Sequence, residues 1–175
     1  GGLFGRSAES FGELRVELDQ IAADPSIAGV VFNVAGPGIG YGQIWELRQR
    51  VDALQSAGKK TVAFMQTADT KSVMLASATE TVWMLPNIVY EPIGVAAQLL
   101  NYKTALAKLG VEAEFLRVRD YKSAPEAYVR DSPSPESLAQ TGAYADHLYE
   151  ALVSSIAQGR NKDPEAVRNV IDQVP

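Results

Sequence analysis

The chain of 175 residues contains no cysteine and a single histidine. Without cysteine the chain has neither disulfide bonds nor thiolate metal sites, and its redox compartment stays open. Any Ser-His-Asp triad within the chain would have to use His147. That residue follows Asp146 in the middle of a predicted helix, with no serine motif nearby. We therefore interpret His147 as a helix-surface or packing residue.

Long apolar runs and basic clusters are also missing. No run approaches the roughly 18 residues that a membrane-spanning helix needs, and no secretory signal is visible. A net charge of −5 and a pI near 4.9 argue against a nucleic-acid surface. Asp, Glu and His do not cluster at metal-ligand spacings, so we expect neither a metal nor a cofactor. Because the chain begins Gly1-Gly2-Leu3 and ends abruptly at Pro175, we expect it to be excised from a longer protein.

The residues that are present predict one globular domain over 1–175. The hydrophobic fraction is 46% and the charged fraction 21%, which suits a folded domain with a sizeable core. Apolar periodicity alternates between helix and strand, and repeating β-α units favour an α/β fold with a largely parallel sheet covered by helices. Helices are predicted at 10–23, from about 43 to Gly58, and at 69–78, 99–109, 135–158 and from Asp163 onward. Strands are predicted at 27–34, 60–65, 81–85 and 112–118, with short irregular strands at 87–95.

The first strand leads into a glycine-rich turn. Residues 27–34 form a nearly continuous apolar run, which is typical of a buried parallel strand. In the turn at 35–42, the backbone N–H groups of Gly36 and Gly38 would be able to donate to an oxyanion or line a peptide cleft. The simpler alternative is a strand-to-helix turn that requires positive φ. A dinucleotide fingerprint does not fit, because the glycine spacing is wrong.

Lys122 is the main candidate for catalytic chemistry. It follows the predicted strand 112–118 and precedes 132–136, which opens a long helix, and α/β proteins usually place their chemistry at such strand ends. A lysine becomes a general base only if burial or nearby cations lower its pKa from about 10.4 to near neutrality. Asp120 and Glu126 act in the opposite direction. The residues alone therefore favour an ordinary surface lysine.

A family resemblance changes that interpretation. Tyr121-Lys122-Ser123-Ala124, followed by Arg130-Asp131 and a Ser-Pro helix start, resembles the catalytic-lysine segment of the S49 family of Ser/Lys peptidases. The similarity extends upstream to Leu75-Ala76-Ser77-Ala78 and covers most of the chain from about Ile27 to Arg160. The resemblance implies the Clp protease/crotonase-like fold, with Lys122 as the catalytic base.

The nucleophile motif of the family is altered in this chain. Catalytic S49 domains carry Ala-Ser-Gly-Gly ahead of Leu/Ile-Ala-Ser, which places Thr70 at the nucleophile position and Lys71 and Ser72 at the two glycines. The side chain of Lys71 stands where a glycine normally lets a backbone N–H reach the oxyanion. Thr70 as a nucleophile is possible in principle, but a helix N-cap threonine is the simpler interpretation. The chain is predicted to hold the base and lack the nucleophile.

The resemblance also implies partners. In long two-domain S49 peptidases, the amino-terminal domain supplies the lysine and the carboxy-terminal domain the serine, across a subunit boundary. This chain resembles that amino-terminal half. The expected partners are the carboxy-terminal catalytic domain, further subunits of a homo-oligomer and apolar signal-peptide substrates. The expected location is the periplasmic face of the inner membrane, with an anchor outside this chain.

Two other interpretations stay open. The first alternative is a non-catalytic crotonase-like domain that serves assembly or peptide binding. An acyl-CoA crotonase enzyme is a more distant third interpretation, because the fold alone does not imply that chemistry. Trp45 and Trp83 are expected in the core or at an interface. Leu3, Phe4 and the last helices are expected to leave apolar surface uncovered and to favour self-association.

Overall fold

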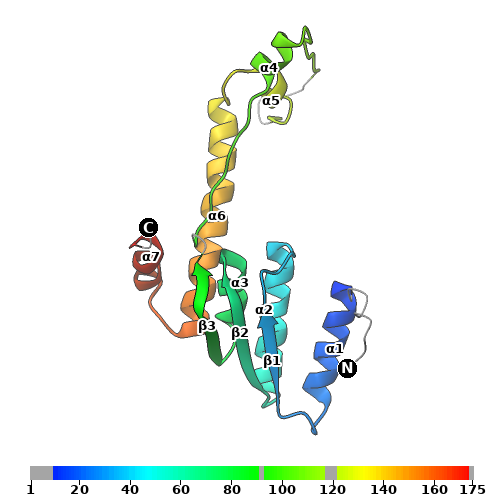
Figure 1. Ribbon diagram of the computed structural model, residues 1–175, viewed down its shortest axis with the longest axis vertical. Helices are drawn as coiled ribbons and strands as arrows, with labels where there is room; N and C mark the ends of the chain where they lie inside the picture. The colour runs from blue at the N-terminus through cyan, green and yellow to red at the C-terminus, as the bar shows by residue number, and fades with distance from the viewer. Residues whose placement is uncertain (1–9, 91–92, 117–121, 174–175) are drawn as a thin grey trace. The chain divides into compact units, whose positions relative to one another are not determined.

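The computed structural model describes residues 10–90, 93–116 and 122–173, and it divides the chain into two compact units (Figure 1). We call residues 1–94 and 152–175 the sheet unit, and residues 95–151 the lysine unit because it contains Lys122. The elements are α1 (Phe11–Ala23), β1 (Gly29–Val34), α2 (Tyr41–Ser56), β2 (Lys60–Ala68), α3 (Thr70–Ala76), β3 (Thr81–Tyr90), α4 (Lys103–Lys108), α5 (Glu126–Val129), α6 (Pro135–Arg160) and α7 (Pro164–Gln173).

The three strands form one parallel sheet in the order β1-β2-β3. Val31 lies opposite Val62, and Met65 lies opposite Met84. The ladder between β2 and β3 is irregular after Met65, and β3 carries Pro86 there, which has no N–H to donate. The mixed α/β architecture with a parallel sheet flanked by helices confirms the predicted fold class. Of the short irregular strands predicted at 87–95, residues 87–90 continue β3, residues 91 and 92 lie outside the described residues, and 93–95 are not a strand.

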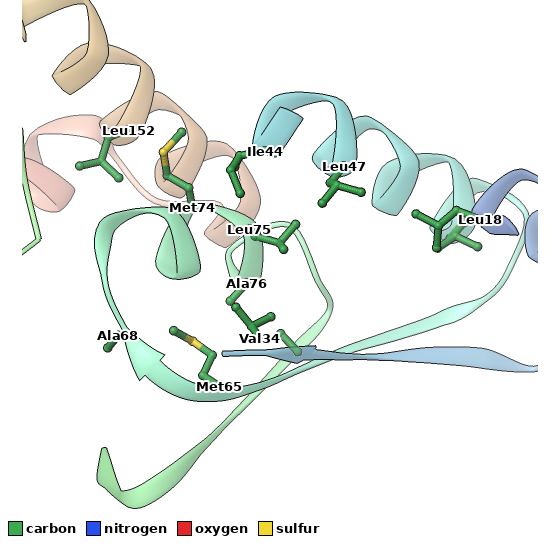
Figure 2. Packing of buried hydrophobic residues seen from close by; sticks show 12 residues of the cluster. Leu18, Val34, Ile44, Leu47, Met65, Ala68, Met74, Leu75, Ala76 and Leu152 are labelled. Atoms are coloured by element: carbon green, nitrogen blue, oxygen red, sulfur yellow. The ribbon is translucent and has the colours of Figure 1, made fainter. Parts of the chain in front are cut away.

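The core lies between one face of the sheet and the helices. Figure 2 shows side chains of α2 and α3 directed toward Val34 and Met65 of the strands. The buried cluster is made of Leu18, Val34, Ile44, Leu47, Leu54, Ala63, Met65, Ala68, Met74, Leu75, Ala76 and Leu152. The buried residues of α2, which include Ile44 and Leu54, lie on one face of the helix predicted from about 43 to Gly58.

The prediction that β1 is buried on both faces is wrong. Its residues alternate in exposure, and the side chain of Val31 is 63% exposed. Because β1 is an edge strand of the described sheet, a continuous apolar run does not guarantee two covered faces. Trp83 of β3 is 59% exposed and Trp45 of α2 is 49% exposed. Neither tryptophan belongs to the core.

Two arginines join the last turns of α6 to the end of α3. The guanidinium of Arg48 donates to the carbonyl of Met74, to Ser77 Oγ at 2.7 Å and to the carbonyl of Ser155 at 2.7 Å. Arg160 donates to the carbonyls of Ala76 and Thr79, each at 2.7 Å. Burial lowers the pKa of both arginines. The bonds to the carbonyls of Met74 and Ala76 satisfy acceptors that the end of α3 leaves without intrahelical partners.

Gly159 allows α6 to approach α3 closely. A Cβ added at Gly159 would lie 1.9 Å from the carbonyl oxygen of Ser77. No side chain fits in that space, because the obstructing atom belongs to the backbone. The contact therefore depends on glycine at this position.

The lysine unit contains α4, α5 and the first turns of α6. The helix predicted at 99–109 is shorter, since α4 spans Lys103–Lys108, and it ends before Gly110, which has φ 71°. The strand predicted at 112–118 is wrong over 112–116, where the structure has no strand; residues 117 and 118 lie outside the described residues. Within the described part of this unit no strand is available to pair with the segment. Phe115 instead packs on Tyr128, with ring centroids 5.9 Å apart.

The other helices begin and end near their predicted positions. Ser10 caps α1 in a capping box with Glu13, and Asp163 accepts the N–H of Glu165 at 2.7 Å at the start of α7. His147 lies exposed on α6. Over the described residues, none of the helices combines the length and apolar character needed to cross a bilayer, and no group of three acidic or histidine side chains is arranged to hold a metal.

Candidate active site

Lys122 lies exposed on the loop that precedes α5. Hydrogen bonds fix the residues that follow it. The carbonyl of Ser123 accepts the N–H of Glu126 at 2.9 Å, and Ser123 Oγ donates to Gln140 Oε1 at 3.1 Å. The prediction placed Lys122 at the end of a strand, but the described residues before it, 112–116, are not a strand. Residues 117–121 lie outside the described residues, and the hydrogen bonds described next to Lys122 come from the residues that follow it.

The glycine turn lies at the carboxyl end of β1. Gly36 has φ 66°, the positive φ that the sequence analysis expected of a turn here. A Cβ at Gly36 would lie 3.6 Å from Thr67 Oγ1 and 3.7 Å from Asp69 Oδ2, so space alone does not require glycine. No heavy atom comes within 4 Å of a Cβ built at Gly38. The backbone conformation at Gly36 is what demands glycine.

Thr70, at the nucleophile position of the family motif, is buried. Its hydroxyl donates to the carbonyl of Gly94 at 3.0 Å and accepts the N–H of Gly94 at 3.1 Å. A nucleophilic hydroxyl gives its proton to a base and its lone pair to the substrate. Here the hydroxyl proton and a lone pair are both engaged by the backbone of Gly94, so Thr70 forms a structural link between α3 and the chain after β3.

Thr70 is not the N-cap of α3, contrary to the interpretation from the sequence. Asp69 is the N-cap: its carboxylate accepts the N–H of Ser72 at 2.9 Å and the Ser72 hydroxyl at 2.7 Å. The helix therefore begins at Thr70, one residue earlier than an N-cap at Thr70 would place its start. Ser72 is completely buried against this carboxylate, so its hydroxyl does not face solvent.

The side chain of Lys71 links α3 to the glycine turn through a hydrogen bond. Its Nζ donates to the carbonyl of Ile39 at 2.7 Å and lies 5.4 Å from the ring centroid of Tyr41. Sequence reasoning treated Lys71 only as a side chain that replaces a glycine, and it missed this link. No sequence signal identifies it, because the acceptor is a backbone carbonyl 32 positions away.

The sheet unit thus brings three predicted positions together, namely Gly36, Thr70 and Lys71, while Lys122 belongs to the lysine unit. From the sequence, Glu126 was expected only as an acid that disfavours a neutral lysine. In the structure its carboxylate is buried and accepts two hydrogen bonds from Ser134. A buried acid four residues from a candidate base is a feature that only the fold reveals.

Comparison with known proteins agrees with the fold. A parallel sheet flanked by helices is the architecture of the Clp protease/crotonase-like class. The profile described as Peptidase family S49 matches residues 53–174, which is more than half of the chain. The chain belongs to peptidase family S49.

Three relatives extend this result. The chain is 26% identical over 95% of its length to the chloroplastic serine protease SPPA of Arabidopsis thaliana. It is 25% identical over 93% of its length to protease 4 of Salmonella typhi, and 25% identical over 97% to a provisionally named signal peptide peptidase SppA of Enterococcus faecium. The chain spans only 25%, 27% and 49% of these three proteins, respectively.

Proposed function

We propose that this chain is the lysine-bearing half of a Ser/Lys serine peptidase, in which Lys122 is the general base and another domain supplies the serine. One observation carries the proposal. The hydroxyl at the family's nucleophile position, Thr70, is committed to the backbone of Gly94 in both directions. The half with an exposed lysine therefore offers no free hydroxyl at the equivalent of the serine.

The chemistry assigned to Lys122 is proton transfer. A neutral amine would accept the serine proton as the serine oxygen attacks the peptide carbonyl, and would then return the proton to the leaving amine. A lysine serves as such a base only when desolvation or nearby cations favour its neutral form. Lys122 is exposed, so the proposal requires a further surface to cover it. The backbone N–H groups of Gly36 and Gly38 would line the substrate cleft or stabilise an oxyanion.

The names of the relatives support the substrate class. They include a serine protease and a signal peptide peptidase, so we assign apolar signal peptides as substrates. The expected partners are a carboxy-terminal catalytic domain and further copies of the same protein. We place the complete enzyme at the periplasmic face of the inner membrane, anchored by a segment outside this chain. In this proposal residues 1–175 form one S49 half.

The decisive experiment is Lys122→Ala in the full-length parent protein. Losing a general base costs about 10²–10⁴-fold, and the sole activator of a serine belongs near the upper end, so kcat should fall by about 10³–10⁴-fold. Thermal unfolding should be unchanged, because Lys122 is exposed. Lys108→Ala, which removes another exposed lysine of the same unit, is the matched control and should keep full activity. Near-wild-type turnover of Lys122→Ala would contradict the proposal.

A second candidate is a non-catalytic domain for assembly or peptide binding. Leu109 and Leu116 of the lysine unit are 77% and 106% exposed, respectively, and such side chains suit an interface. Two results would favour this candidate. The first is a parent sequence without a downstream Ala-Ser-Gly-Gly repeat. The second is retained activity of Lys122→Ala. Hydrolysis of an apolar peptide ester by this chain alone, abolished by Thr70→Ala, would contradict both candidates.

A further inference from the structure

The lysine unit buries an acid beside the loop of residues 122–125, which we call the lysine loop. Among its described residues the buried side chains are those of Glu126, Ser134 and Ser137, and Glu126 is only 3% exposed. Burying a carboxylate is costly unless hydrogen bonds or opposite charges compensate it. A buried acid in a unit that lacks an apolar core therefore requires an explanation.

The carboxylate of Glu126 binds the start of α6. Its Oε2 accepts the backbone N–H of Ser134 at 2.9 Å, and its Oε1 accepts the Ser134 hydroxyl at 2.8 Å. Ser134 Oγ in turn accepts the N–H of Ser137 at 3.1 Å. The negative charge is favourable at the amino end of a 26-residue helix, where N–H groups lack intrahelical partners. Glu126 therefore fastens α5 to the first turn of α6.

The short helix α5 depends on such external contacts. It has only four residues, and a single helical turn is not stable by itself. The side-chain amide of Asn101 donates to the carbonyls of Glu126 and Arg130 at 3.4 and 3.1 Å. The N–H of Tyr102 donates to the carbonyl of Ala127 at 2.6 Å. These bonds hold the carboxyl end of α5, while the Glu126 carboxylate holds its amino end.

The same contacts extend to Lys122. The N–H of Glu126 donates to the carbonyl of Ser123 at 2.9 Å. The hydroxyl of Ser123 donates to Gln140, in the second turn of α6, at 3.1 Å. The chain that immediately follows Lys122 is thus tied to α6 twice, through Ser123 and through Glu126.

We infer that Glu126 is a positioning residue for Lys122: its buried bond to Ser134 fixes the lysine loop against α6 and so sets where the base is presented. The inference rests on the proposed function. Glu126 takes no part in proton transfer itself. A misplacement of about 1 Å in a catalytic group can cost about 10²-fold in rate, so loosening this link should reduce turnover without changing substrate binding.

The test uses Glu126→Gln in the full-length parent protein. Glutamine keeps the size of the side chain but directs an N–H₂ donor at the Ser134 donors. We expect kcat to fall by about 10- to 100-fold, with KM unchanged within about twofold. Glu114→Gln, which removes an exposed acid of the same unit, is the control and should leave kcat unchanged. A Glu126→Gln enzyme with wild-type kcat would overturn the inference.

A second measurement separates positioning from general stability. In Lys122→Ala, added ethylamine replaces the missing base, and this free amine does not depend on the lysine loop. If Glu126 acts through Lys122, the amine-rescued rates of Lys122→Ala and Lys122→Ala/Glu126→Gln should agree within about twofold. The inference would be overturned if Glu126→Gln lowered the amine-rescued rate of Lys122→Ala by 10-fold or more, as it is expected to lower kcat when Lys122 is present.

Two further outcomes complete the design. Ser134→Ala keeps the hydrogen bond from the backbone N–H to Glu126 and removes the bond from the hydroxyl. It tests the positioning role of Glu126 if Glu126→Gln does not fold. It should lower kcat by about 3- to 10-fold, and this fall should vanish in the amine-rescued background; wild-type kcat would overturn the inference. Full activity of Lys122→Ala would remove the proposed function and the inference together. An inactive Lys122→Ala with fully active Glu126→Gln and Ser134→Ala would remove the inference alone.

Discussion

The two units of this chain are stabilised by different forces. Among the described residues, all buried hydrophobic side chains belong to the sheet unit, from Leu18 to Val167. In the described part of the lysine unit, the only buried residues are Glu126, Ser134 and Ser137. Apolar burial is the dominant favourable term in folding, so the sheet unit contains its own source of stability. The lysine unit is ordered mainly by hydrogen bonds, and we expect a covering surface to complete it.

The exposed apolar residues fit this difference. In the lysine unit they include Leu109, Val111, Phe115 and Leu116, which all lie within residues 109–116. Such surface usually marks an interface. The self-association predicted from the sequence stays a prediction, and Leu3 and Phe4 lie outside the described residues. On α7, Val170 is exposed, as the expectation for the last helices requires.

The substitution with the largest expected effect on stability is Arg48→Met in the sheet unit, and it tests the difference between the two units. This change removes a buried guanidinium and leaves the carbonyls of Met74 and Ser155 without its hydrogen bonds. We expect a loss of about 2–4 kcal/mol in the free energy of unfolding, measured by denaturant titration. Arg50→Met is the control, since it breaks a partly exposed pair with Asp19 at 2.8 Å and should cost about 0–1 kcal/mol. Equal losses would mean that Arg48 does not secure α3.

A smaller effect separates two glycines of the same helix. Gly159→Ala places a methyl group against the carbonyl of Ser77 and should destabilise the sheet unit by about 1–3 kcal/mol. Gly142→Ala lies in the part of α6 that belongs to the lysine unit, with no heavy atom within 4 Å of the added Cβ. It should stabilise the helix by about 0.5–1 kcal/mol. Thermal unfolding of both variants gives the comparison, and a neutral Gly159→Ala would contradict the close packing.

The smallest effect concerns pH. The N–H of Thr61, at 3.2 Å, and then Lys60 hold the pKa of Glu80 below its usual value. A carboxyl with a lowered folded pKa contributes stability above its unfolded pKa, and that contribution is lost as pH falls through the folded value. Glu80→Gln should therefore lower the Tm slightly at pH 7, and the difference should disappear at strongly acidic pH.

Asp131 provides the counterpart in the lysine unit. Its pKa is also lowered, by the hydroxyl of Thr104 and then by Lys103. Because this unit lacks an apolar core among its described residues, Asp131→Asn should leave the main thermal transition unchanged at every pH. A shift as large as that of Glu80→Gln would show that the two units unfold together.

The sequence predicted the sheet unit better than the lysine unit, for a physical reason. The apolar periodicity of α2 and the run at β2 arise from burial, and burial leaves a pattern in the sequence. The prediction for β1 was wrong because an apolar run does not show how many faces of a strand are covered. The alternating segment 112–116 has a strand pattern, yet the described structure offers it no strand to pair with.

The candidate site was predictable only in its positions. The motif order located Lys122 and Thr70, and the positive φ at Gly36 followed from its turn. The bonds that decide what these residues do were not predictable. Thr70 is linked to Gly94, and Glu126 is linked to Ser134. Such contacts join positions that no local pattern connects, so they follow only from the fold.

The placement of the tryptophans has a consequence for spectroscopy. The chain has two tryptophans, and both Trp45 and Trp83 belong to the sheet unit. The intrinsic tryptophan emission should therefore report on that unit alone and should not report on the loop that carries Lys122. Since both indoles are about half exposed in the folded state, their emission maximum should move little on denaturation. A fluorophore introduced into residues 95–151 would be needed to observe the loop that carries Lys122.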